Sequence, residues 1–180
     1  MKHYFLLTLI LSASFHAYGD ETTSIRLNHE SNNADSASGI AILFDIGKPK
    51  TFLVSLGFSA NSISSDESLA HAGRNNIYPV YGFVKFASTY RISPFFEFGI
   101  DLGDVLIEDF EEFINHHEEE DNDSAIDTYL SLGLTLKINK KMTASLYRKM
   151  YNINFSEVGF STINEVDLYM TGASLSYYLD

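Results

Sequence analysis

The chain has no cysteine and no tryptophan, and it holds only 12 basic residues against 24 acidic ones. Without cysteine, no disulfide can staple the domain, so the fold must rest on hydrogen bonds and packing. The formal net charge of −12 argues against binding nucleic acid or anionic headgroups by simple charge attraction. No segment has the roughly 18 consecutive apolar residues of a membrane-spanning helix. What remains is an acidic chain that can form no disulfide.

The first 19 residues have the pattern of a secretory signal peptide. Lys2 supplies the positive start, Phe5 to Leu11 the apolar centre, and Ala17-Tyr18-Gly19 a small-x-small cleavage site. We therefore expect a signal peptide over residues 1–19 and a single domain over residues 20–180.

Strict alternation of apolar and small residues begins in the stretch from Ile40 to Ala60. Side chains of a strand leave opposite faces of the pleat in turn, so this period of two predicts strands. The segment from Gly47 to Lys50, which includes Pro49, supplies turn chemistry between the two runs. The stretch is therefore predicted to be an antiparallel hairpin with one wholly apolar face.

Similar alternation recurs along the rest of the chain and predicts eight strands in all. Besides the two strands of the hairpin, they are Thr23 to Ser31, Ile77 to Ala87, Ile92 to Asp104, Ile126 to Ile138, Met142 to Phe155 and Val166 to Leu179. The polar connections alternate between long and short. The long ones are expected over Asn32 to Ser38, Asn61 to Asn76, Ile107 to Ser124 and Ser156 to Glu165. An even-numbered up-and-down meander follows from this pattern.

The polarity of the two faces favours a barrel with its apolar side outward. The apolar faces run for several alternate positions, and about ten tilted residues span roughly the 25 Å of a lipid-facing band. The opposite faces are rich in small residues, which suit a narrow interior. They also carry charges of both signs that would have to pair there. This predicted lumen charge network comprises Arg26, Asp45, Lys85, Glu97, Asp101, Asp127, Lys137 and Arg148. The predicted fold is all-β, an eight-stranded antiparallel up-and-down transmembrane β-barrel.

The combination of a signal peptide, eight strands and a final strand with Gly172, Leu175 and Tyr177 resembles the small outer-membrane β-barrels of Gram-negative bacteria, of OmpA/OmpX architecture. The resemblance implies an outer-membrane location, contact with lipid and lipopolysaccharide, insertion by the barrel-insertion machinery, and a monomer. A side-chain-filled lumen of eight strands is not expected to conduct bulk solutes. The sequence therefore favours a non-enzymatic structural or surface-interaction role, with no cofactor and no nucleic-acid partner.

The segment from Ile107 to Ser124 holds nine carboxylates and no Lys or Arg. Carboxylate oxygens suit hard divalent cations, and imidazoles suit zinc or copper. The candidate metal ligands are His116, His117, Glu118, Glu120 and Asp121, although their spacing matches no known ligand set. A solvated, self-repelling acidic loop is the simpler interpretation. Divalent-cation bridging to lipopolysaccharide is favoured over a dedicated metal cage.

Two other functions remain open from the sequence. His29-Glu30-Ser31-Asn32 is similar to the His-x-Ser-Asn motif of outer-membrane lipid A deacylases, which implies a lipid-modifying hydrolase with His29 as base and Ser31 as nucleophile. That family carries its motif late in the chain, whereas here it follows the first strand, and coincidence is the simpler interpretation. The other alternative is a soluble periplasmic lipocalin-like binding protein, which would turn the apolar faces inward.

Overall fold

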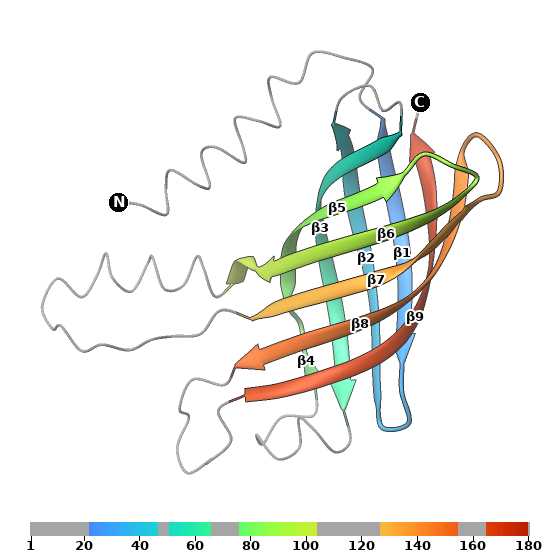
Figure 1. The fold of residues 1–180 in the computed structure, drawn as a ribbon. Helices are drawn as coiled ribbons and strands as arrows, with labels where there is room; N and C mark the ends of the chain where they lie inside the picture. Colours follow the sequence, from blue (N-terminus) through green and yellow to red (C-terminus); the bar gives the residue numbers. More distant parts are fainter. Residues whose placement is uncertain (1–21, 47–50, 66–75, 104–126, 155–164, 180) are drawn as a thin grey trace, which may run out of the picture.

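The computed structural model describes residues 22–46, 51–65, 76–103, 127–154 and 165–179, and nine strands lie within these ranges. Figure 1 shows them wrapped, tilted, around one barrel. Their bounds are β1 Thr23–Ser31, β2 Asp35–Ile46, β3 Phe52–Ser65, β4 Asn76–Ile77, β5 Val80–Ser88, β6 Ile92–Asp101, β7 Thr128–Lys137, β8 Met142–Asn154 and β9 Glu165–Leu179. The predicted signal peptide and the acidic segment from Ile107 to Ser124 lie outside the described residues.

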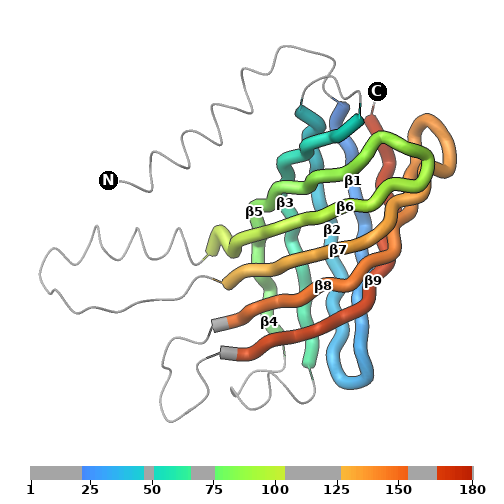
Figure 2. The backbone as a smooth tube through the Cα atoms, in the orientation of Figure 1, coloured from blue at the N-terminus to red at the C-terminus, as the bar shows by residue number. Residues whose placement is uncertain are grey.

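Antiparallel pairing closes the sheet on itself. The strands follow the order β2-β1-β9-β8-β7-β6-β5-β3, and β2 also pairs with β3, which closes the ring. The tube in Figure 2 shows β1 between β2 and the last strand, β9. Closure leaves no long edge strand within the described part of the chain. The eight-stranded antiparallel barrel predicted from the alternation is confirmed.

One of the eight staves of the barrel is divided into two strands, β4 and β5, which lie end to end along β3. The short β4 pairs with the end of β3, and β5 continues that pairing after a break at Tyr78 and Pro79. Proline has no N–H to donate to a ladder, so it interrupts the strand predicted from Ile77 to Ala87. The Pro79 carbonyl still accepts a hydrogen bond from the Asn61 N–H (3.1 Å).

The long connection predicted over Asn32 to Ser38 is wrong. The turn between β1 and β2 has only three residues, and it is closed by the backbone hydrogen bond from the Asn32 N–H to the Asp35 carbonyl (3.0 Å) and by the Asn32 side chain. Its Oδ1 accepts from the N–H groups of Ala34 (2.8 Å) and Asp35 (2.6 Å), and its Nδ2 donates to Asp35 (2.7 Å). Asparagine closes tight turns in this way. β2 and β3 are consequently longer than the alternating core of the hairpin suggested.

The barrel has its apolar face outside. Large exposed apolar side chains cover its outer wall, among them Leu27 (58 %), Leu132 (56 %) and Leu146 (68 %). Serines and charged side chains are buried inside it. A lipocalin-like protein would have the opposite polarity, so that alternative is wrong. None of the helical residues described is part of a helix long and apolar enough to cross a membrane.

The register of β8 corrects the predicted charge network. Odd-numbered residues point inward along the whole strand, in unbroken pairing with β7 and β9. Lys149 is therefore buried (5 % exposed), and Arg148 lies on the outer face. Lys137, also predicted inside, is exposed because it is the last residue of β7.

Candidate functional site

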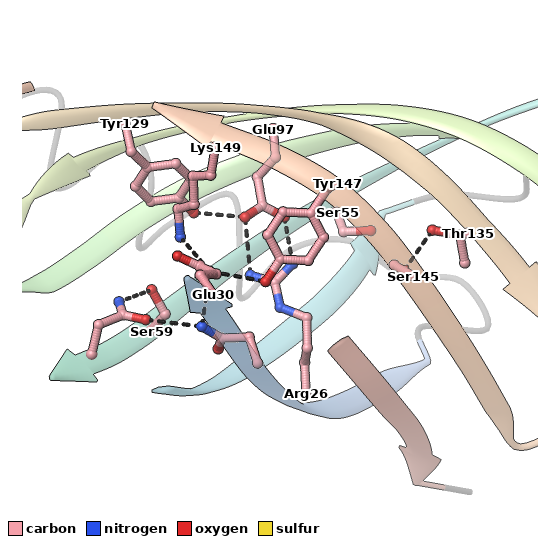
Figure 3. Close-up of polar contacts among 12 residues, drawn as sticks. Arg26, Glu30, Ser55, Ser59, Glu97, Tyr129, Thr135, Ser145, Tyr147 and Lys149 are labelled. Atoms are coloured by element: carbon pink, nitrogen blue, oxygen red, sulfur yellow. Dashed lines mark hydrogen bonds and ion pairs between the residues drawn. The ribbon is translucent and has the colours of Figure 1, made fainter. Parts of the chain in front are cut away.

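The barrel interior contains a hydrogen-bonded network centred on two carboxylates, shown in Figure 3. The first is Glu30, which β1 directs inward and which is fully buried. It accepts hydrogen bonds from Tyr147 (2.8 Å), Tyr151 and Asn28 (3.1 Å), and Lys149 Nζ lies 3.3 Å away. Four donors around one carboxylate offset the cost of burying its charge.

The second carboxylate is Glu97, on the opposite wall of the barrel. Arg26 donates to both of its oxygens (2.5 and 3.0 Å), and the Tyr129 hydroxyl donates to Oε1 (2.7 Å). Two parallel N–H···O bonds of this kind hold the guanidinium plane in one orientation and also compensate its charge. Arg26 and Glu97 come from β1 and β6, so this pair ties strands across the lumen.

Aromatic rings join the two carboxylate centres. Lys149 Nζ lies 3.9 Å from the ring centroid of Tyr129 and 4.6 Å from that of Tyr151. Tyr129, which donates to Glu97, packs edge-to-face on Tyr81 at a centroid distance of 4.9 Å. A cation against a ring face is stabilised by the ring quadrupole. The charged and aromatic groups therefore form one connected layer.

Four further members of the predicted network, Asp45, Lys85, Asp101 and Asp127, are also buried. Lys85 is opposite Glu97 in the register, yet its Nζ lies over the Phe95 ring at 4.4 Å. Asp45 accepts hydrogen bonds from the hydroxyls of Ser55 (2.7 Å) and Thr22 (2.8 Å), next to the start of β1. Asp101 accepts from the Gly103 N–H (2.8 Å), and Asp127 is buried next to it, its carbonyl accepting from the Asp101 N–H (2.7 Å).

Apolar side chains close the interior on both sides of the charged layer. One apolar cluster fills the interior at the end of the barrel opposite the start of β1. It includes Ile63, Tyr81, Ile153, Leu168 and Met170, each at most 1 % exposed. A smaller cluster of Ala87, Phe95 and Tyr147 lies towards the other end. The interior is thus packed as well as hydrogen-bonded.

The apolar exterior and the ion-paired interior together define the architecture. The chain is a small eight-stranded antiparallel transmembrane β-barrel. No protein-family model and no curated protein matches it.

Several solved structures have a similar fold. A de novo designed transmembrane β-barrel is 9 % identical, with a TM-score of 0.42, covering 88 % of this chain and 95 % of the other. Neisserial surface protein A is 8 % identical, with a TM-score of 0.48, covering 87 % and 94 %. The outer-membrane enzyme PagL is 12 % identical, with a TM-score of 0.42, covering 89 % and 99 %.

The residues of the predicted hydrolase motif lie on the outer face of this transmembrane barrel. His29 and Ser31 are both exposed and point to the same side of β1. However, the His29 ring contacts the Ser38 hydroxyl of β2, with Nδ1 and Oγ 2.8 Å apart. Ser38 is the residue directly opposite His29 in the antiparallel register. The histidine–serine contact expected within β1 is therefore replaced by one between β1 and β2.

The candidate metal ligands from His116 to Asp121 lie outside the described residues, so their role stays a prediction. Within the described ranges, no group of three or more His, Cys, Asp or Glu side chains could hold a metal ion.

Sequence reasoning missed two central members of the interior network, Glu30 and Lys149. Glu30 shares the parity of Arg26 and Asn28 on β1, although in the sequence it stands within a polar motif at the strand end. Lys149 shares the parity of Tyr147 and Tyr151. Strand parity, carried to the end of each strand, was the signal that could have identified both.

Proposed function

We propose that this protein is a non-conducting structural or surface-interaction barrel in the outer membrane of a Gram-negative bacterium, exported by a cleaved signal peptide. The observation that supports this most is the filled interior. We further propose that it is a monomer, inserted by the barrel-insertion machinery, with lipopolysaccharide among its lipid neighbours.

The interior disfavours conduction for two physical reasons. A hydrated ion would have to separate Arg26 from Glu97, and uncoupling a buried pair costs about 3–5 kcal/mol. It would also have to displace the apolar cluster around Tyr151 and Met170, which are fully buried. Close-packed protein interiors have few voids as large as a water molecule. A role at the surface of the barrel would leave these interior contacts unchanged.

Conductance across planar bilayers tests the proposal. The folded chain is expected to give no steady current. The double variant Tyr151→Ala/Met170→Ala removes bulk from the inner cluster and is expected to raise ion leakage. Tyr169→Ala is the matched control, because this tyrosine is 52 % exposed on the outer face of the same strand as Met170. A steady current through the unaltered chain would refute the closed lumen.

A second candidate function, hydrolysis of lipid esters, is favoured by the contact between His29 and Ser38. A histidine within hydrogen-bond reach of a serine hydroxyl is the minimum required to activate that hydroxyl as a nucleophile. Both residues face the side where lipid would lie. Among the described residues, however, no carboxylate hydrogen-bonds to the His29 ring, so the pair lacks the third group that usually orients the base.

Release of fatty acid from lipid A by the inserted chain tests this second function. Ser38→Ala and His29→Ala are expected to abolish release if the pair is catalytic. Ser31→Ala, whose hydroxyl is also outward, tests the nucleophile expected from the motif. No release by the unaltered chain removes the hydrolase altogether.

A further inference from the structure

The outer wall of the barrel is interrupted by a polar patch made of neighbouring residues on four strands. We define the outer polar patch as His29, Ser31, Ser36, Ser38, Arg148 and Thr171, all exposed. One pairing row runs from Arg148 to Thr171 to Ser31 to Ser36. The next row is polar on β1 and β2, where it holds His29 and Ser38, and apolar on β9 and β8, where it holds Ala173 and Leu146. The patch therefore spans β8, β9, β1 and β2, which lie side by side.

This patch has an apolar boundary on two sides, whereas on the third its rows continue into Ser62 and Ser64 of β3. The row next to His29 and Ser38 on the side of the start of β1 lies two residues further along each strand. It is wholly apolar and consists of Ala144, Leu175, Leu27 and Ile40. On its other side, Arg148 pairs with Leu132, which is apolar and 56 % exposed. A cation therefore borders the lipid-facing surface directly. An arginine on a lipid face is tolerated best near the headgroup level, where its guanidinium can reach polar groups.

Nothing in the described part of the protein neutralises this cation. Arg148 makes no ion pair or side-chain hydrogen bond with the described residues. No carboxylate belongs to either row of the patch. Asp167, further along β9, accepts a hydrogen bond from Asn152 (3.0 Å). The patch thus offers one unpaired guanidinium, an imidazole and four hydroxyls, which are the donors that bind a phosphate oxygen.

We propose that the outer polar patch binds the phosphate of a lipid headgroup, with Arg148 as the principal contact. The lipid source follows from continuity with the apolar row below, because an acyl chain lying along Leu27, Ile40 and Leu175 brings its headgroup to the patch. The chain as a whole is acidic, so the attraction is local to these two rows. The inference rests on the proposed membrane insertion and adds a ligand to it.

Lipid retention by the full chain tests the site. The protein is inserted into phosphatidylcholine vesicles doped with lipid A, in its phosphorylated form or after removal of its phosphates. It is then released into mild detergent, and the lipid that stays bound is measured by native mass spectrometry. The chain is expected to retain the phosphorylated form about fivefold better, equivalent to about 1 kcal/mol. Arg148→Gln is expected to bring this ratio close to one.

Arg91→Gln is the matched control, because Arg91 is an exposed arginine in the turn before β6, at the other end of the barrel. It should leave the ratio unchanged. Equal retention of both lipid forms, or equal loss in the two variants, would overturn the proposal. Complete competition by excess inorganic phosphate would overturn the lipid as the source. Heat-shifted gel mobility of each variant reports insertion separately, so a failure to insert contradicts the proposed function and a loss of selectivity in an inserted barrel contradicts only the patch.

Discussion

Removing one partner of the Arg26–Glu97 pair should harm the barrel more than removing both. Arg26→Met leaves the Glu97 carboxylate buried without its two guanidinium hydrogen bonds (2.5 and 3.0 Å), which should cost about 3–5 kcal/mol of unfolding free energy. Glu97→Met leaves Arg26 uncompensated at a similar cost. If the two effects were independent, the double variant would lose roughly 6–10 kcal/mol.

The double variant should instead lose only about 1–3 kcal/mol, the cost of the Tyr129 hydroxyl that no longer has Glu97 as an acceptor. Urea unfolding in lipid vesicles, followed by far-ultraviolet circular dichroism, measures these values, and the absence of tryptophan makes the usual fluorescence assay unsuitable. Lys137→Met, at an exposed strand end, is the control and should change stability by less than about 0.5 kcal/mol. An additive double variant would refute the view that the two charges compensate each other.

Two further predictions follow from the same interior. Lys149→Met should destabilise the barrel by about 3–5 kcal/mol because it leaves Glu30 without its cation, whereas Arg148→Met, one residue away on the lipid face, should be neutral or stabilising; equal effects in urea unfolding would contradict the register of β8. Gly172→Val should cost at least about 1–3 kcal/mol, since a Cβ there would lie 2.6 Å from Glu30 Cγ. Unfolding of this variant next to Ala173→Val, which faces outward on the same strand, checks it, and equal stability of the two would be the contrary result.

Most of the fold could be predicted because successive side chains of a strand point to opposite faces, so the two faces appear in the sequence with a period of two. β1 has the predicted bounds, and the outward positions of Leu27 and Leu132 follow from alternation alone. Strand ends were less predictable. The Asn32 turn and the break at Pro79 depend on individual side-chain and backbone hydrogen bonds, which hydrophobic periodicity does not register.

Alternation is a local property of each strand, so strands with one apolar and one small-residue face could be predicted from the residues alone. Which charges meet depends on the tertiary structure. Glu30 and Lys149 are 119 residues apart in the chain, and their contact depends on how the sheet closes into a barrel and on the register of its strands. The same closure sets His29 against Ser38, and it aligns Arg148 with the hydroxyls of β9, β1 and β2. A one-residue change of register reverses every face, so these sites exist only in the closed barrel.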